Sequence, residues 1–208
     1  MNQRLVWNFE FAPHTTTFPA GLLVKQEAEP IKWEIRFFWP DDETIVLNTI
    51  DNSLLDLANY HQKHREDYYY LLPGSNYNIK KRHHELLYKP LLQQSERALG
   101  FAAKINIDAL TEQPHKTNQH DPLVHELVQR IAHEGVEVYV KKEAFIYKFP
   151  TQPTIKLELA RLEVQNQVYL SACIEGKALE LVESIAEHLL GKQVSCEYVT
   201  FLKNILHI

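Results

Sequence analysis

A run of basic residues between Asn78 and Lys104 is the part of the sequence best suited to chemistry. It holds six Lys or Arg against two Glu, a local charge of +4 in a chain of net charge −5. Alternation places Lys80 and Arg82 on one face of a strand, and Lys89 can join them from a return strand. Guanidinium groups bind phosphate in a bidentate manner and ammonium groups act as point charges, so this face suits a polyanion. A solvated surface is the alternative interpretation.

Motifs for other chemistries are incomplete. Three His-Glu dipeptides lack the second histidine that a zinc-protease helix needs four residues after the first, which excludes that class. The sequence contains no Gly-rich phosphate loop and no G-x-S-x-G motif, and Cys173 and Cys196 form no C-x-x-C pair. These observations argue against nucleophilic catalysis. The three dipeptides begin at His84, His125 and His133.

Alternating apolar and polar residues predict that most of the chain is β-structure. In 31–37, Lys32, Glu34 and Arg36 share one face and four apolar residues share the other. The same alternation predicts strands over 5–11, 103–108, 155–160 and 168–175, a long strand over 136–149, and a hairpin over 77–91 that turns near His83 and His84.

Helical periodicity is restricted to four segments. Ser53 is a candidate N-cap for the first, and Pro122 begins the second, which ends at Gly135. Gly191 closes the third. Several strands, mostly antiparallel by their spacing, together with a few helices predict an α+β domain. The four helices are expected over 52–65, from 122 to 135, over 177–190 and over 196–206.

The charged faces of the strands allow two interpretations. One is an open antiparallel sheet whose polar side faces solvent. The other is a barrel turned inside out, whose charged faces line a tunnel and whose apolar faces are covered by helices. Closure would also remove exposed strand edges. The alternation is compatible with both.

Six short motifs follow one another in a fixed order between residues 30 and 190. Lys32-x-Glu34-x-Arg36 resembles a degraded ExExK strand, and 67–71 (DYYYL) resembles a D-x-Y segment. Segments 77–82 (YNIKKR) and 85–90 (ELLYKP) are similar to an L-R-x-R strand and its L-x-x-K-x-P return. Segments 157–160 (LELA) and 173–176 (CIEG) resemble two acidic strands that precede a helix. Together they resemble the CYTH superfamily, the triphosphate tunnel metalloenzymes.

The resemblance implies one CYTH-like domain over 1–208, folded as an eight-stranded antiparallel tunnel-type β-barrel with flanking helices. Members of this superfamily hold a triphosphate with basic residues and Mg²⁺ or Mn²⁺ with acidic ones. The implied phosphate-binding set is Lys32, Arg36, Lys80, Arg82, Lys89 and Lys141. The implied catalytic and metal-binding set is Glu34, Glu158 and Glu175.

The acidic half of the pattern is depleted. Lys32 stands where the opening motif has its first acid, and Ala160 and Cys173 replace two more. Hard divalent cations need several carboxylate oxygens, and a neighbouring ammonium group repels them. The resemblance therefore leaves two functions open: metal-dependent triphosphate hydrolysis, and a binding module that kept the phosphate cradle but lost the metal. An open-sheet interaction protein without a pocket is the third alternative.

Composition limits the class of protein more than its function. A chain of 208 residues with 45% hydrophobic and 24% charged residues suits a globular domain. Its acidic net charge disfavours nucleic acid as a partner, and the lack of an apolar run of about 18 residues disfavours a membrane span. Two cysteines suit a reduced, cytoplasmic setting. We expect a small phosphorylated anion as the partner, and the oligomeric state, a homodimer included, stays open.

Overall fold

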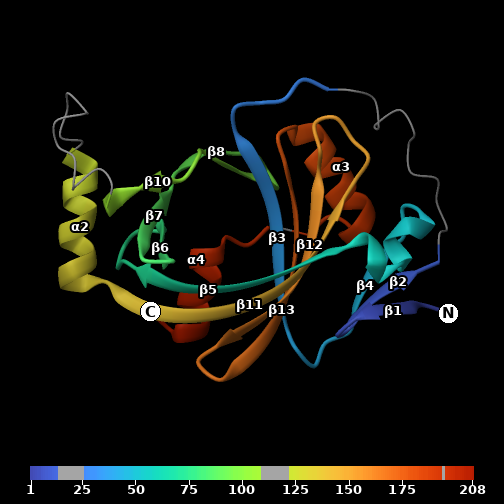
Figure 1. Cartoon of the computed structure of the whole chain (residues 1–208), viewed down its shortest axis with the longest axis horizontal. Coiled ribbons are helices and arrows are strands. Elements are labelled where there is room, and N and C mark those ends of the chain that lie inside the picture. Colours follow the sequence, from blue (N-terminus) through green and yellow to red (C-terminus); the bar gives the residue numbers. More distant parts are fainter. Residues whose placement is uncertain (14–25, 109–121, 194) are drawn as a thin grey trace.

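Residues 1–13, 26–108, 122–193 and 195–208 are described by the structure, a computed structural model of the chain. Ten strands form its strongly curved main sheet (Figure 1). They are β3 (Lys32–Pro40), β5 (His61–Leu71), β6 (Asn78–Arg82), β7 (Glu85–Lys89), β8 (Leu91–Gln94), β9 (Leu99–Phe101), β10 (Ile105–Asn106), β11 (Val136–Lys148), β12 (Lys156–Val164) and β13 (Gln167–Gly176). The strands are all antiparallel to their neighbours, in the order β10-β7-β6-β5-β11-β12-β13-β3-β9-β8.

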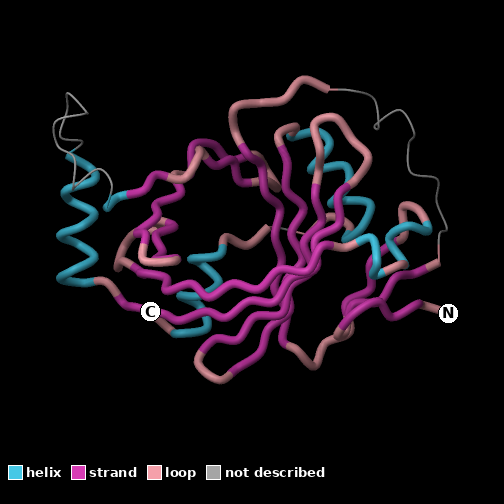
Figure 2. The backbone as a smooth tube through the Cα atoms, viewed as in Figure 1, coloured by secondary structure: helices cyan, strands magenta, loops and turns pink. Residues whose placement is uncertain are grey.

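The main sheet curls into a half-barrel (Figure 2) and does not close as an eight-stranded barrel. Its hydrogen-bonded order begins at β10 and ends at β8, and no ladder joins these two edges within the described residues. The chain itself crosses between the two ends of the sheet at Pro90, which separates β7 from β8, and again at 102–104. Proline has no N–H to donate to a ladder, so the sheet is interrupted there. The prediction of a closed, eight-stranded barrel is wrong in strand number and in closure.

The convex face of the sheet is apolar and covered over β3, β12 and β13. Alternate residues of these strands, among them Ile35, Leu157 and Ile174, pack against α3 (Leu179–Leu190). A second sheet extends the same core with Phe9 and Leu47. Because an alternating strand must bury its apolar side, α3 and this small sheet position the charged side of the strands on the opposite, concave face. The small sheet consists of β1 (Gln3–Val6), β2 (Phe9–Ala12) and β4 (Ile45–Asn48).

The other end of the convex face is covered by α2 (Pro122–Glu134). Leu127 of this helix packs in one cluster with Ile79 of β6 and Tyr88 of β7. The neighbours of Ile79 in the sequence, Asn78 and Lys80, consequently face the concave side. No helix in the described ranges is long and apolar enough to cross a membrane.

The concave face is shared between a helix and a set of charged side chains. α4 (Tyr198–Leu206) lies inside the curl of the sheet (Figure 1). Its Tyr198 and Phe201 pack in one cluster with Val140 of β11 and Ala160 of β12. One half of the concave face is therefore apolar, and the charged residues gather on the other half.

Most of the predicted elements are confirmed. The strands expected over 31–37, 136–149, 155–160 and 168–175 are found as β3, β11, β12 and β13, and the last three predicted helices correspond to α2, α3 and α4. The 77–91 hairpin turns at His83 and His84, whose φ angles are 47° and 71°. Two-residue hairpin turns need such positive values.

Three of the predicted elements are wrong or reduced. The helix expected over 52–65 is two short 3₁₀ turns, Asn52–Leu55 and Leu57–Asn59, followed by β5, and Asp51 rather than Ser53 caps the first turn. Residues 5–11 form a hairpin that turns at Trp7, and the 103–108 strand is limited to Ile105–Asn106. Residues 61–65 are extended rather than helical because β5 pairs with β11 over its whole length.

Candidate functional site

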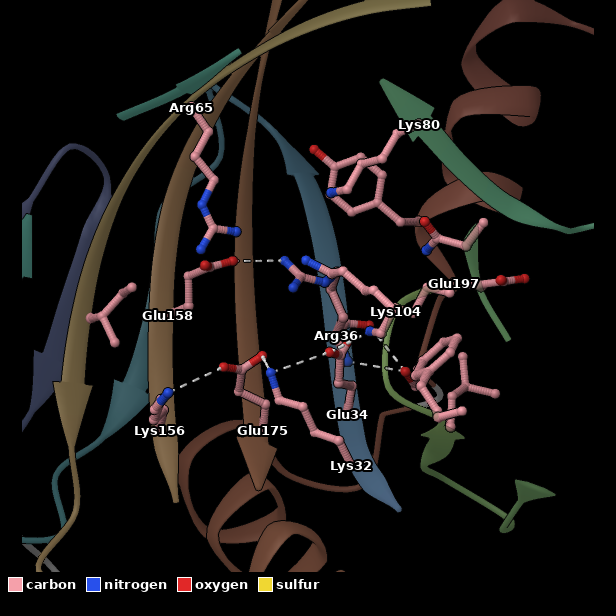
Figure 3. A pocket seen from close by; sticks show the side chains of 18 of the residues that line it. Lys32, Glu34, Arg36, Arg65, Lys80, Lys104, Lys156, Glu158, Glu175 and Glu197 are labelled. Carbon is pink, nitrogen blue, oxygen red and sulfur yellow. Dashed lines mark hydrogen bonds and ion pairs between the residues drawn. The ribbon is translucent and has the colours of Figure 1, made fainter. Parts of the chain in front are cut away.

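A cavity of about 510 Å³ opens on the charged half of the concave face (Figure 3). Eight strands of the sheet line it, namely β3, β5, β6, β7, β9, β11, β12 and β13, together with segments 102–104 and 195–198. The first of these segments is the crossing between β9 and β10, and the second leads into α4. The volume falls within the range of small-molecule sites, roughly 300–1,000 Å³.

Cations dominate the lining of this cavity. Eleven Lys or Arg line it against four Glu, an excess of seven positive charges in a chain whose net charge is −5. Half of the 22 Lys and Arg residues of the protein are therefore gathered here. The cations are Lys32, Arg36, Lys63, Arg65, Lys80, Lys89, Lys104, Lys142, Lys148, Lys156 and Lys177. The acids are Glu34, Glu158, Glu175 and Glu197.

Glu34 and Glu175 are neighbours in the register between β3 and β13, and three lysines surround them. Lys32 Nζ lies 2.6 Å from Glu175 Oε2 and 3.8 Å from Glu34 Oε1. Lys89 Nζ lies 2.6 Å from Glu34 Oε1, and Lys156 Nζ lies 4.0 Å from Glu175 Oε1. Burial alone would raise the pKa of Glu34, but Lys89 and Lys32 lower it to about 2. Both carboxylates act as anchors for lysine side chains.

Glu158 lies at a second buried ion-pair cluster. Arg36 Nη1 donates to Glu158 Oε1 over 3.1 Å, and Lys142 Nζ donates to the same oxygen over 2.9 Å. Ser171 Oγ accepts a further hydrogen bond from Arg36 Nη1 at 3.3 Å. Burial opposes ionisation of Glu158, but Lys142 and Arg36 hold its pKa well below its usual range. One oxygen of this carboxylate therefore holds both cations at the wall of the cavity.

Asp67 of β5 organises the third cluster. Arg82 donates two hydrogen bonds to its carboxylate, at 2.6 Å from Nε and 2.5 Å from Nη2, and Lys80 Nζ donates a third at 3.0 Å. Burial would raise the pKa of Asp67, but these two cations lower it to about 2. Lys80 lines the cavity, whereas Arg82 is on the same face but outside the lining. The sequence motifs included Asp67 without assigning it a role.

Five cavity cations form no ion pair within 4.0 Å to a described residue: Lys63, Arg65, Lys104, Lys148 and Lys177. Arg65 Nε is shielded from solvent and has no hydrogen-bond partner among the described residues. Burial, and then repulsion by Arg82 and Arg65, lowers the pKa of Lys104 to about 8. No carboxylate among the described residues neutralises these five cations, so they are available to bind an anion.

The predicted metal-binding residues do not fit a hard divalent cation. Glu34 and Glu175 do meet, and Cys173 completes a group whose ligand atoms lie within 4.8 Å of one another. Lys32 Nζ already donates a hydrogen bond to Glu175 and forms an ion pair with Glu34, and burial raises the pKa of the Cys173 thiol, which keeps it protonated. Glu158 is bound to its own two cations instead. Mg²⁺ and Mn²⁺ prefer oxygen ligands free of a competing ammonium group, so we derive no step through a metal.

The structure brings most of the predicted site residues to one cavity. Lys32, Glu34, Arg36, Lys80, Lys89, Glu158 and Glu175 all line it. Arg82 supports it through Asp67, as described above. Lys141 lies outside it: its side chain is 55% exposed, and its nearest acid is Glu163 at 4.0 Å. Its neighbour Lys142 faces the cavity instead.

The other lining residues were missed by the analysis of the sequence. Lys63 and Arg65 lie in the first part of β5, which the predicted helix over 52–65 included, although the alternation of charged residues over 61–69 indicates a strand. Lys148, Lys156 and Lys177 lie at strand ends or just after them, where an isolated charge is ordinary. Glu197 has no signal in the sequence, because only the fold of the 195–198 segment places it at the cavity.

No protein-family model and no curated protein matches the chain. A solved structure from Bacillus halodurans, described as a "putative adenylate cyclase", is similar over 79% of this chain and 93% of that chain. The sequence identity is 11% and the TM-score is 0.39. A likeness at this level defines neither family nor function.

Proposed function

We propose that this protein binds a small, multiply phosphorylated anion in the cavity on the concave face. The proposal rests on five cavity cations that form no ion pair with the described residues, whereas carboxylates bind the other six. Burial is the largest cause of the lowered pKa of Lys104, and repulsion by Arg82 and Arg65 adds to it, so gathering these like charges is unfavourable. A polyanion relieves this repulsion and supplies the acceptors that the cations lack.

The distribution of the cations favours an extended anion over a single phosphate. Lys63 and Arg65 come from β5, Lys104 from the crossing before β10, and Lys148 from the end of β11. A ligand that contacts several of these elements needs more than one phosphoryl group. The six CYTH-like motifs of the sequence agree with this ligand class.

The charge outside the cavity argues against a macromolecular polyanion. Since the cavity carries seven excess positive charges and the chain −5 in total, the remaining residues carry an excess of twelve negative charges. Such a surface repels nucleic acid, whereas a small anion is drawn to the cationic cleft. The proposed partner is therefore a small molecule.

We propose binding without metal-dependent turnover. Hydrolysis of a triphosphate by the family's chemistry needs Mg²⁺ or Mn²⁺ at the carboxylates, and Lys32 competes for Glu34 and Glu175. A lysine there neutralises the ligand directly but does not activate water. Incubation with tripolyphosphate and Mg²⁺ or Mn²⁺ should yield no phosphate release above background, and turnover abolished by EDTA would assign the protein to the hydrolases.

Isothermal titration calorimetry with tripolyphosphate at low ionic strength tests the proposed function. Lys104→Gln should weaken binding by about 1.5–3 kcal/mol, the range for a hydrogen bond to a charged group, which is about ten- to a hundredfold in Kd. Lys192→Gln is the matched control, because it removes the same charge from a side chain that is 80% exposed and outside the cavity. It should bind as the wild type does.

Two results would remove the proposal. One is the absence of heat or of thermal stabilisation with millimolar tripolyphosphate. The other is an equal loss of affinity in Lys192→Gln and Lys104→Gln, which would indicate nonspecific attraction by net charge rather than a site.

A further inference from the structure

The four acidic side chains of the cavity are not equivalent. Glu34, Glu158 and Glu175 each form ion pairs with cavity cations, whereas Glu197 forms none with the described residues. Glu197 Oε1 is also shielded from solvent and has no hydrogen-bond partner in the described part of the chain. A negative charge on Glu197 is therefore poorly compensated, in a cavity that otherwise suits an anion.

The surroundings of Glu197 explain how this acid is tolerated. It precedes the first turn of α4 at the edge of the cavity (Figure 3), and Lys89 of β7 and Lys203 of α4 are the charged groups that face it. Lys89 is bonded to Glu34, and Lys203 donates to two backbone carbonyls, so both are committed elsewhere. Burial outweighs these two lysines and the hydrogen bond to Thr200, and raises the pKa of Glu197 to about 7.

We propose that Glu197 acts in its protonated form, so that the phosphorylated anion and one proton bind to the cavity together. This role of Glu197 rests on the proposed function and adds a residue that contacts the bound anion. A neutral carboxyl does not repel the anion and can donate its proton to a phosphoryl oxygen. An ionised carboxylate would instead place two like charges in one enclosed space, and the bound anion would drive proton uptake.

Glu197→Gln tests this coupling, because glutamine keeps the size and stays neutral at every pH. Tripolyphosphate affinity is measured by calorimetry for both proteins at pH 6 and pH 8. At pH 8, one unit above the value of about 7, about nine tenths of the free wild type carries an ionised Glu197. The wild type should then bind about tenfold more weakly than the variant. At pH 6 the two Kd values should agree within about twofold.

Comparison of the two proteins at one pH cancels the titration of tripolyphosphate and of the lysines. Glu187→Gln is the matched control, since Glu187 is 47% exposed in its ion pair with Arg97 and does not line the cavity. Its affinity relative to wild type should be the same at pH 6 and at pH 8.

A second measurement compares proton exchange on binding. Titrations at pH 7 in buffers of different ionisation enthalpy report this exchange, and the contributions of tripolyphosphate and of the lysines cancel between wild type and variant. The wild type should take up about half a proton more than Glu197→Gln, or than Glu197→Ala if the glutamine variant fails to fold.

Two results would overturn the inference and leave the proposed function standing: a wild-type to variant affinity ratio that is the same at pH 6 and pH 8, or equal proton exchange by wild type and variant at pH 7. Absence of tripolyphosphate binding by the wild type at both pH values would remove the proposed function as well, so the two failures are distinguishable.

Discussion

At the residue scale, the acids of the cavity wall position cations. Glu34 and Glu175 would form a carboxylate pair across β3 and β13, but Lys32, two residues before Glu34 on the same face, donates a hydrogen bond to Glu175 and forms an ion pair with Glu34. Burial by itself lowers the pKa of Lys32, and the Coulomb attraction of Glu175 and Glu34 reverses this and raises it. The ammonium group thus stays charged and stands where a divalent cation would need to bind.

Lys32→Glu should convert this pair into a divalent-cation site, because it removes the competing ammonium and adds a third carboxylate. We expect Mn²⁺ affinity of the ligand-free protein to rise at least about tenfold over wild type, by electron paramagnetic resonance titration. Lys148→Glu makes the same charge change at another position of the cavity wall and should leave Mn²⁺ binding nearly unchanged. Equal gains in both variants, or Mn²⁺ binding by the wild type at micromolar concentration, would contradict the role of Lys32.

At the element scale, α4 decides which part of the concave face is polar. Phe201 is 7% exposed and its ring stacks on Phe38 of β3 at a centroid separation of 3.9 Å. Tyr198 stacks on Tyr69 of β5 at 4.9 Å, and Arg36 lies over the Tyr198 ring at 5.5 Å. The helix therefore closes one end of the cavity and connects its apolar packing to a cavity cation.

Phe201→Ala should lower the free energy of unfolding by about 3–5 kcal/mol, the cost of removing a buried aromatic ring. Urea denaturation measures it. Val46→Ala, at a side chain that is 45% exposed, should change stability by no more than about 0.5 kcal/mol. A loss below about 1 kcal/mol for Phe201→Ala would mean that α4 is not part of the cooperative fold.

At the scale of the whole molecule, the buried ion-pair clusters connect stability to pH. The folded-state pKa values of Glu34 and Asp67 are both about 2, below the usual value of about 4 for such groups when unfolded. A lowered folded-state pKa contributes stability that is present above the unfolded value and is lost as the pH falls through the folded value. The window of loss therefore runs from about pH 4 down to pH 2.

The free energy of unfolding should fall by several kcal/mol between pH 5 and pH 2.5, as each of these two carboxylates contributes about 2–3 kcal/mol. Urea titrations at intermediate pH values follow the loss. Asp67→Asn removes one of the two titrating groups, so its stability should be lower at pH 7 and should depend less on pH over the same window. A variant whose pH dependence matches that of the wild type would contradict the assignment to this cluster.

Local alternation determined most of the sheet and much of the cavity. In β3, Lys32, Glu34 and Arg36 face the cavity as their two-residue spacing requires, and the apolar residues between them bury against α3. The hairpin of β6 and β7 could also be predicted from the sequence, because a two-residue turn sets its register. When one face of a strand is buried beneath a helix, its polar side chains must lie on the opposite face of the sheet.

Tertiary packing decided what alternation left open. On β11, Lys141 faces outward, whereas Lys142 and Lys148 share the concave side with Val140 and Ala144, against which α4 packs. The cavity lysines of this strand are consequently Lys142, one residue from Lys141, and Lys148 at its end. The same contact places Ala160 under α4, at a position where the resembling motif has an acid. Which face of a strand is polar is a local property, but which face meets the cavity depends on α4, which follows both strands in the sequence.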